Sequence, residues 1–432
     1  MGRANQDSAM DLALSERARR EKATEITRLM KMTLDQPDLI SLAVGFVDQV
    51  SLPREEVAQT VAALLADREE GLSALQYGTT IGLAPLRKEI ARRLGEGGLA
   101  GVVGLDDILI TSGSQELLYL VTDVLVDPGD IVLVEDPTYF AFAAVLKGAA
   151  ARAVGVASDD DGMIPEALEA RLAQFEQRGE LDRVKMLYLM SYFSNPRGTS
   201  FSWERRESVY EITGRFGHGG RPITIVEDTA YCWLRFEGPE VPFLKTLDRD
   251  NERVVLAGSF SKSFAPGLRV GFGALPKDLM PHLITQKSYH DFGSPNFAQS
   301  VLCKALKDRS YDRHVEDLRR RYQAKRELAL RTIAEHWPSQ VRANRPLGGM
   351  YIWAALPEAV STDPGGPLFE TAVEQHRVLY IPGSYCYVAD SPDDKPHNEM
   401  RICYGMIDDQ QMVEGLKRLG RAIAAVLRSA NG

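Results

Sequence analysis

Short apolar runs rich in β-branched residues recur between residues 106 and 259, and each ends in a polar or glycine turn. Between several of them, stretches such as residues 114–126 and 165–178 carry apolar residues at helical spacing. Runs that are apolar throughout are typical of strands buried on both faces. The pattern predicts an α/β fold, with a mostly parallel sheet covered by helices and ligands bound at the carboxyl ends of its strands. The predicted strands are DDILITSG (106–113), DIVLVEDP (130–137), VKMLYLMS (184–191), ITIVEDTA (223–230) and RVVLAGS (253–259).

The pattern changes after about residue 310. A long charged helix over residues 314–337 ends near Pro338, and short strand candidates and a terminal helix follow. We therefore expect a second, smaller α+β domain, joined by the N-terminal forty-odd residues. The expected division is residues 1–50 as an N-terminal segment packing with the small domain, 51–315 as the large domain and 316–432 as the small domain. The strand candidates of the small domain are GGMYIWAAL (348–356), VLYIPGS (378–384) and NEMRICYG (398–405).

Bulk composition narrows the class of protein. The chain has 432 residues, enough for two domains. Its 51 basic and 60 acidic residues give a formal charge of −9, which argues against nucleic acid or an anionic membrane as the main partner. No apolar run approaches the ~18 residues of a membrane span. The N-terminal stretch is too polar for a secretory signal, and the four cysteines have no paired spacing. We expect a cytoplasmic enzyme with reduced thiols and no metal.

The stretch GSFSKSFAPGLRVGFG (258–273) is the most informative segment of the chain. Lys262 brings an amine together with Ser259, Ser261 and Arg269, which suit a phosphate. Upstream, ITIVEDTAYCWLRF contains Asp228 and Tyr231. A lysine for an imine, a carboxylate for a pyridine nitrogen and a set of phosphate donors fit pyridoxal 5'-phosphate. Taken alone, Asp228 after its strand is also a good helix N-cap.

Further candidates follow other strand ends. Gly113 allows a turn that opens a helix, where the N–H groups of Ser114 and Gln115 favour a phosphate, although serine is also an ordinary N-cap. Asn195, in Asn-Pro-Arg-Gly, is placed for the cofactor's phenolic oxygen, unless the segment is a simple turn. Tyr139 also follows a strand end, where it could stack on the pyridine ring of the cofactor. The alternative is that it packs in the hydrophobic core.

Two candidates concern the substrate. Arg401 lies within a predicted strand, where an unpaired cation is costly. A substrate carboxylate would satisfy it as a bidentate partner, and the alternative is a structural salt bridge. Tyr77, in a glycine-rich loop before a basic helix, is a candidate for reaching a phosphate across a subunit interface.

Assembled in this order, the motifs resemble the fold-type I, class I/II aminotransferases of the aspartate aminotransferase superfamily, from about Leu39 to the C-terminus. The form Ser-x-Ser-Lys-x-x-x-Pro-Gly-Leu-Arg-x-Gly is most similar to the 2-aminoadipate and kynurenine aminotransferase branch. The resemblance implies a seven-stranded sheet and a homodimer with shared active sites. The implied roles are Lys262 as Schiff-base lysine and proton shuttle; Asp228 on the pyridine nitrogen; Tyr231 and Asn195 on the phenolic oxygen; Tyr139 on the ring; Ser114, Gln115, Ser259, Ser261 and Arg269 on the phosphate; Arg401 and Gly45 on the substrate; and Tyr77 reaching the neighbouring site.

The chain departs from the family pattern at Gly45-Phe46-Val47, where Gly-x-Pro is common, and at Arg197, where Thr or Ser is commoner. These differences concern which substrate the site accepts, and they leave the cofactor residues intact. An aromatic wall of Tyr77, Tyr139, Tyr192 and Phe193 is expected to favour aromatic or branched aliphatic substrates.

The expected reaction is transamination between an L-amino acid and a 2-oxo acid. The alternatives are another enzyme with the same cofactor (a lyase, including an aminocyclopropane-carboxylate-synthase-like enzyme, a decarboxylase or an oxidase) and an aminotransferase-like effector domain of a transcription regulator. About forty residues precede Gly45, too few for the winged-helix domain expected of such a regulator.

Overall fold

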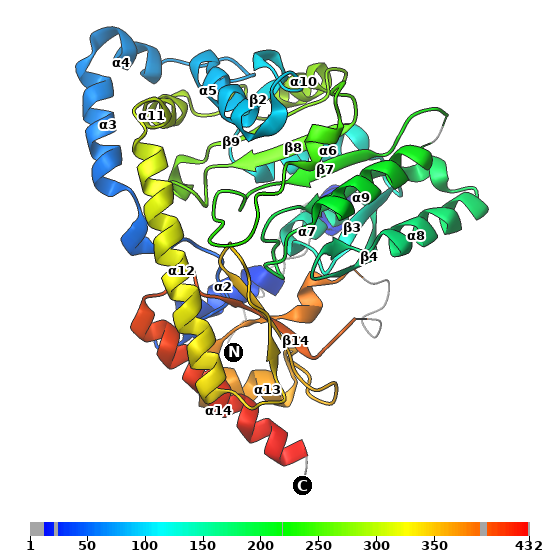
Figure 1. Cartoon of the computed structure of the whole chain (residues 1–432), viewed down its shortest axis with the longest axis vertical. Helices are drawn as coiled ribbons and strands as arrows, with labels where there is room; N and C mark the ends of the chain where they lie inside the picture. The colour runs from blue at the N-terminus through cyan, green and yellow to red at the C-terminus, as the bar shows by residue number, and fades with distance from the viewer. Residues whose placement is uncertain (1–12, 21–24, 218, 389–394, 431–432) are drawn as a thin grey trace, which may run out of the picture.

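A twisted sheet of eight strands forms the centre of the larger part of the molecule (Figure 1). The computed structural model describes residues 13–20, 25–217, 219–388 and 395–430. The strand order is β2-β9-β8-β7-β6-β3-β4-β5, and the five central strands from β8 to β4 are parallel. The predicted α/β class is confirmed, and the two-residue β5, which pairs antiparallel with β4, adds an eighth strand at one edge. The strands are β2 (Ile108–Thr111), β3 (Ile131–Asp136), β4 (Arg152–Asp159), β5 (Gly162–Met163), β6 (Val184–Met190), β7 (Thr224–Asp228), β8 (Val254–Ser259) and β9 (Gly271–Ala274).

Both faces of this sheet are buried by helices, as the continuous apolar runs predict. Along β3, Val132 and Val134 belong to one hydrophobic cluster, whereas Ile131 and Leu133 belong to another on the opposite face. The covering helices are α5 (Ala84–Leu94), α6 (Ser114–Leu125), α7 (Phe140–Gly148), α8 (Pro165–Gln177), α9 (Trp203–Arg215), α10 (Met280–His290) and α11 (Asn296–Lys307), with α3 (Arg54–Ala66) and α4 (Arg68–Leu75) packed on α11.

Strand β9 is antiparallel to both of its neighbours and was not predicted as a strand. Its sequence is glycine-rich, and glycine weakens the local signal for a strand. The glycines are needed because backbones approach closely there. A Cβ on Gly271 would lie 2.5 Å from the carbonyl carbon of Gly113, at the start of α6.

The smaller part of the molecule is built on a four-stranded antiparallel sheet of order β10-β11-β14-β13. The long α12 links the two parts, running down the left side of Figure 1 and packing on α14. Segment 40–41 also joins the small part, since β1 pairs with β12. The elements are α1 (Glu16–Arg20), α2 (Glu25–Asp35), β1 (Ile40–Ser41), α12 (Ser310–His336), β10 (Arg342–Ala343), β11 (Tyr351–Ala355), α13 (Pro367–Glu370), β12 (Val378–Leu379), β13 (Ile381–Pro382), β14 (Glu399–Cys403) and α14 (Asp409–Ala430).

The predicted domain boundary at 315/316 falls inside α12, and residues 1–12 and 21–24 of the expected N-terminal segment lie outside the described residues. The three-part division of the chain stays a prediction.

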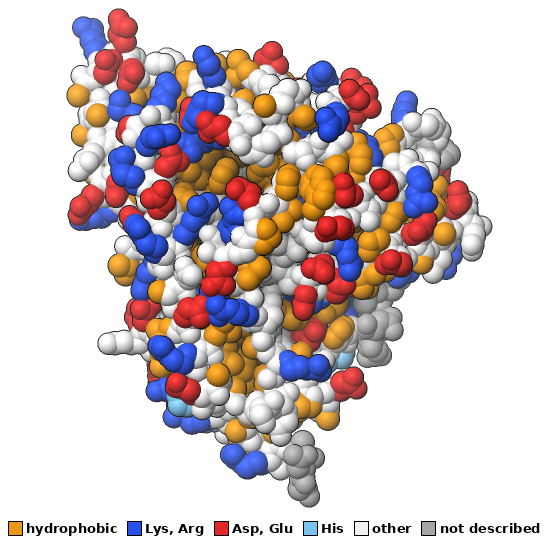
Figure 2. All heavy atoms as spheres, viewed as in Figure 1, with side chains coloured by type: hydrophobic (Ala, Val, Ile, Leu, Met, Phe, Trp, Pro, Cys, Tyr) orange, Lys and Arg blue, Asp and Glu red, His pale blue; other side chains and the backbone are white. Residues whose placement is uncertain are grey.

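On the face shown in Figure 2, basic and acidic side chains are interspersed, and no continuous basic stripe crosses it. Among the described residues, no helix is long and apolar enough to cross a membrane.

Candidate active site

Lys262 lies in the turn that follows β8, at the carboxyl edge of the sheet. Its Nζ donates a hydrogen bond of 2.8 Å to the carbonyl oxygen of Gly45. Burial lowers the pKa of the Lys262 amine to about 8; the neighbouring thiol of Cys403 opposes this shift, and the charges of Arg401 and Arg269 add to it. At pH 7 about a tenth of this amine is therefore unprotonated, far more than for an ordinary lysine, and the unprotonated amine is the form a nucleophilic lysine requires.

This pKa makes a prediction for the cofactor-free protein. Below about 8 the Lys262 amine is protonated and unreactive, and above it the amine is free, so reactivity rises as the pH increases through that value. Labelling by a trace of amine-specific reagent, followed at the Lys262 peptide by mass spectrometry, should show a midpoint well below the ordinary value of a lysine amine, about 10.4. A midpoint at the ordinary value would contradict the assigned environment.

Asp228 ends β7, and the residue is 2% exposed. Tyr188 donates a hydrogen bond to one carboxylate oxygen and the backbone N–H of Ala230 donates to the other, each at 3.0 Å. Burial raises the pKa of Asp228 to about 6, and these two hydrogen bonds oppose the rise. Within the described part of the chain, Asp228 forms no ion pair with a basic side chain. A buried carboxylate of this kind calls for a cationic partner, and a protonated ring nitrogen fits.

Arg401 is the buried cation of the site, as Asp228 is its buried anion. It is 2% exposed, and its Nη1 and Nη2 donate hydrogen bonds of 2.6 Å to Asn195 Oδ1 and to the carbonyl oxygen of Ala43. Its Nε is buried without a hydrogen-bond partner, and in the described residues no carboxylate forms a salt bridge with it. The structural salt bridge considered as an alternative is therefore not formed by these residues. The guanidinium lies over the ring of Tyr351, 4.5 Å from its centroid.

The turn before α6 and the loop after β8 form a polar cradle. Arg269 donates through Nη2 to the carbonyl oxygen of Ser112 at 3.1 Å and through Nη1 to Ser261 Oγ at 3.3 Å. Ser114 and Gln115 occupy the first positions of α6, where backbone N–H groups have no partner inside the helix. Ser259 Oγ accepts from the backbone N–H of Ser261 at 3.1 Å, which shapes the loop. Free N–H groups, hydroxyls and one guanidinium are the donor set of a phosphate site.

Gly113 gives this cradle its shape and supplies a second prediction. Its φ of 84° is unfavourable for other residues, and a Cβ there would lie 2.5 Å from Arg269 Nη2. We expect Gly113→Ala to lower stability by about 1–2 kcal/mol and to weaken phosphate-dependent ligand binding as well. The matched control is Gly179→Ala, because Gly179 also has positive φ (67°) but a Cβ there would meet nothing within 4 Å. Thermal unfolding and pyridoxal phosphate titration of both variants check this, and equal binding in the two would contradict it.

Most of the predicted residues meet at one place. Segment 43–45 touches both Lys262 and Arg401, and Arg401 holds Asn195. The amide oxygen of Asn195 is thereby engaged, which leaves its NH2 group as a donor. Tyr139 occupies the N-cap position of α7. Burial, and after it the charge of Asp228, raises the pKa of the Tyr139 hydroxyl to about 12, so the ring lies within electrostatic range of that carboxylate.

Two tyrosines at the site were missed from the sequence. Tyr351, at the start of β11, shares a hydrogen bond of 2.8 Å with the hydroxyl of Tyr231. Tyr188 lies within the apolar run of β6, where its hydroxyl gives no local signal, yet it donates to Asp228. Tyr188 can be matched with Asp228 only once β6 is known to be the neighbour of β7, and Tyr351 comes from the sheet of the smaller part, so neither contact has a local signal in the sequence.

Tyr77 does not reach Lys262 within this chain. It is 85% exposed and packs edge-on against Phe292. The aromatic wall predicted with it also needs correction. Tyr192 donates to the carbonyl oxygen of Val241 beneath the Arg206 guanidinium, and Phe193 is buried in the core.

Arg197, whose direction the sequence left open, turns toward β4. It donates to the carbonyl oxygen of Ser158 at 2.8 Å and to Asp160 Oδ1 at 3.0 Å. Its charge is therefore matched by a carboxylate of the chain, in contrast to the charge of Arg401.

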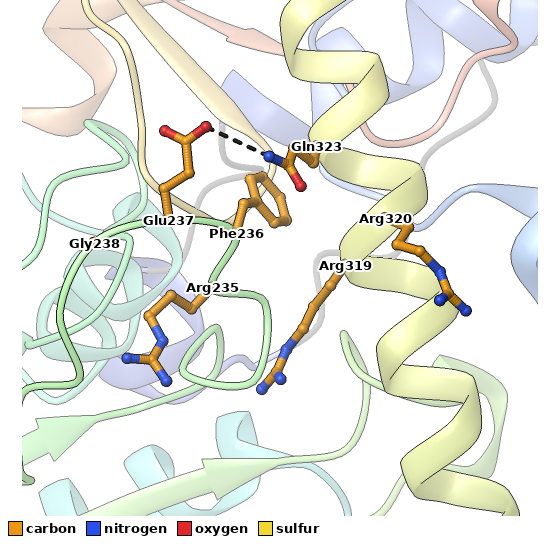
Figure 3. Close-up of a pocket in the computed structure, with 7 residues that line it drawn as sticks. All are labelled: Arg235, Phe236, Glu237, Gly238, Arg319, Arg320 and Gln323. Atoms are coloured by element: carbon orange, nitrogen blue, oxygen red, sulfur yellow. Dashed lines mark hydrogen bonds between the residues drawn. The ribbon is translucent and has the colours of Figure 1, made fainter.

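A separate cavity of about 370 Å³ opens between the loop after β7 and α12 (Figure 3). Arg235 and Arg319 are among its lining residues, and Gln323 donates to Glu237 at 3.4 Å, both also in its lining. None of the predicted site residues lines it. Across the described ranges, no group of three His, Cys, Asp or Glu side chains is placed to hold a metal ion.

Among the described residues, the site combines the amine of Lys262 with a carboxylate and a guanidinium that lack an oppositely charged partner, an arrangement that fits the pyridoxal 5'-phosphate class of enzymes. Comparison with known proteins agrees with this class. A family model described as aminotransferase class I and II matches residues 37–419. The chain is 34% identical to an aromatic-amino-acid aminotransferase of Thermococcus litoralis, over 95% of this chain and 93% of that protein. It is 32% identical to a 2-aminoadipate transaminase of Thermus thermophilus, over 96% and 97%.

A solved structure extends the likeness to three dimensions. The kynurenine aminotransferase of Pyrococcus horikoshii is 31% identical and superposes with a TM-score of 0.87, covering 96% of this chain and 98% of that one. The chain belongs to the class I and II aminotransferases, which are pyridoxal 5'-phosphate enzymes of fold type I.

Proposed function

We propose that this chain moves an amino group between an L-amino acid and a 2-oxo acid at the site built around Lys262. One observation carries the assignment: among the described residues, the buried carboxylate of Asp228 has no cationic partner and the buried guanidinium of Arg401 has no anionic one, and both lie at the site of Lys262. A cofactor with a basic ring nitrogen and a substrate with a carboxylate would match both charges.

Pyridoxal phosphate, when bound, supplies an aldehyde for amines and a ring that withdraws electrons from the substrate α-carbon. Asp228 would hold a proton on the ring nitrogen, and its pKa of about 6 keeps it ionised at neutral pH. Tyr231 and Asn195 would donate toward the phenolic oxygen, and Tyr139 would pack on the ring. The cradle of Ser114, Gln115, Ser259, Ser261 and Arg269 would hold the phosphate.

Lys262 has the proton-transfer role. Its amine, with a pKa of about 8, would accept a proton from the substrate α-carbon and return it at C4' of the cofactor. The hydrogen bond from Nζ to the Gly45 carbonyl positions the amine on the side of the site where segment 43–45 also meets Arg401.

For the substrate, we propose that Arg401 binds the α-carboxylate and that the side chain is aromatic or long and aliphatic. The names of two relatives support an aromatic side chain, an aromatic-amino-acid aminotransferase and a kynurenine aminotransferase, whereas a third relative is named for 2-aminoadipate, whose side chain ends in a carboxylate. Arg197 is held by Asp160, so it offers no unmatched charge for a distal acidic group.

We further propose a cytoplasmic homodimer. The exposed pair of Tyr77 and Phe292 supports it, because neighbouring exposed aromatic rings are a candidate contact surface, here for the active site of the neighbouring subunit. Light scattering of the cofactor-loaded protein tests the dimer.

The function is tested with the loaded enzyme in single turnover. Each amino acid of a panel is added, and the loss of the visible absorbance of the lysine-bound cofactor is recorded. Formation of a new amino acid from added 2-oxoglutarate or pyruvate supports transamination, whereas release of ammonia without a new amino acid supports a lyase. Borohydride reduction followed by digestion and mass spectrometry must find the cofactor on the Lys262 peptide, and its absence there would refute the assignment.

A further inference from the structure

A buried ionic cluster lies directly behind the phosphate cradle. Lys287, on α10, is 0% exposed. Its Nζ donates to both carboxylate oxygens of Glu116, at 3.2 and 3.3 Å, to Ser294 Oγ at 2.9 Å, and to Asp291. His290 Nδ1 lies 3.4 Å from Glu116 on the side nearer to solvent. Burying a lysine with two carboxylates is costly unless the charges are paired, and here Lys287 is paired with both, although Oδ1 of Asp291 is buried without a hydrogen-bond partner.

The cluster is joined to the cradle through Ser112. Glu116 Oε2 accepts the backbone N–H of Ser112, and Ser112 Oγ lies 3.4 Å from Ser294 Oγ. The carbonyl oxygen of the same Ser112 accepts from Arg269 Nη2 at 3.1 Å. Ser112 is thus held on one side by the ionic cluster and on the other by the arginine of the cradle. Gly113 and the open N–H groups of α6 follow immediately.

The charges of the cluster bear on an anion at the cradle. Glu116 and Asp291 place two carboxylates behind the turn, and Lys287 is the buried cation that offsets them. Without Lys287, both carboxylates would face the phosphate through the turn, in an interior where such charges are weakly screened.

We infer that Glu116 and Lys287 are positioning residues for the phosphate cradle: Glu116 fixes the turn through Ser112, and Lys287 keeps the two carboxylates from repelling the phosphate. This inference rests on the proposed function, because it takes the cradle as the cofactor's phosphate site. The competing explanation is structural only. A glutamate at the third position of a helix often accepts a backbone N–H near the helix start, with no consequence for a ligand.

The experiment compares two probes of the cofactor-free protein, pyridoxal phosphate and pyridoxal. The second has the same aldehyde and ring but no phosphate, so the ratio of their affinities isolates the cradle. Both are titrated by visible absorbance into the wild type, Glu116→Ala, Glu116→Gln and Lys287→Met. The matched control is Lys245→Met, which removes another fully buried lysine, bonded to the carbonyl of Val254 at the opposite end of β8.

We expect Glu116→Ala and Lys287→Met to weaken pyridoxal phosphate binding by about tenfold or more, the equivalent of one lost buried hydrogen bond or ion pair. Pyridoxal binding should change little, and Glu116→Gln, which keeps an acceptor for Ser112, should recover part of the loss. Lys245→Met should lower the melting temperature without changing the ratio.

If the ratio of the two affinities is unchanged in Glu116→Ala, the inference is overturned and the proposed function is left intact. If Glu116→Ala does not fold, an unchanged ratio in both Glu116→Gln and Lys287→Met has the same meaning. A change of ratio in Lys245→Met as large as in Lys287→Met would overturn it too, by assigning the effect to stability. A wild type that binds the two probes equally would remove the cradle from the proposed function itself.

Discussion

Replacing Lys262 by alanine is expected to lower turnover by about 10⁴-fold or more, because one side chain supplies both the covalent attachment and the proton transfer. The variant should still take up pyridoxal phosphate, since the cradle of Arg269, Ser261 and the start of α6 does not involve the amine. The bound cofactor should lack the absorbance of a lysine adduct. Steady-state turnover and the visible spectrum of the loaded variant measure the two effects separately.

Lys277→Ala is the control, because Lys277 is exposed and, in the part of the chain that the structure describes, its one hydrogen bond runs from its backbone N–H to Asn251, which is not a site residue. It should match the wild type in both measurements. Wild-type turnover or a wild-type spectrum in Lys262→Ala would show that another amine carries the cofactor, and the roles assigned to Asp228 and Tyr231 would then fail with it.

The site residues that could be predicted are those whose neighbours in the sequence already indicate their role. Lys262, Ser261 and Arg269 lie in one stretch, and the turn between them is set by nearby glycine and proline residues. Asp228 and Ser114 each follow an apolar run directly. In a parallel sheet the carboxyl ends of such runs meet at one edge, so their convergence could be predicted before the strand order was known.

The parts that the sequence did not predict depend on which strands are neighbours. Tyr188 donates to Asp228 only because β6 pairs with β7, with Met190 opposite Asp228. Tyr351 meets Tyr231 across the two halves of the molecule, 120 residues apart in sequence. Arg197 shows the same limit, because its motif fixed its position but not its direction, which depends on Ser158 and Asp160 at the end of β4.

Segment 43–45 explains why the site needs both halves of the molecule. The neighbouring β1 pairs with β12 of the small part, while the Gly45 carbonyl accepts from Lys262 of the large part. A Cβ on Gly45 would lie 2.4 Å from Tyr351 Oη, so glycine is required where this backbone passes the tyrosine pair. The departure from the family pattern after Gly45 therefore leaves the essential contact in place.

Arg401→Met is expected to lower kcat/KM for an amino acid substrate by about 10³-fold, equivalent to about 4 kcal/mol, because a buried charge pair with the substrate carboxylate is lost. Nε and the remaining N–H groups of Nη1 and Nη2 are the donors available to a carboxylate, since one bond from each Nη goes to Asn195 or Ala43. The loss should appear mainly in KM for both the amino acid and the 2-oxo acid, while cofactor binding is retained.

The sharper measurement compares an amino acid with the amine that lacks its carboxylate. The wild type should prefer the amino acid strongly, and Arg401→Met should lose most of that preference, whereas Arg401→Lys, which keeps the charge but not the planar fork, should lose part of it. Arg326→Met is the matched control, because Arg326 is also fully buried but is paired with Glu237 and Glu327 of the chain, so its loss should lower the melting temperature and leave the preference unchanged. If Arg401→Met keeps the wild-type preference, the carboxylate is bound elsewhere, and the unmatched charge of this arginine has another purpose.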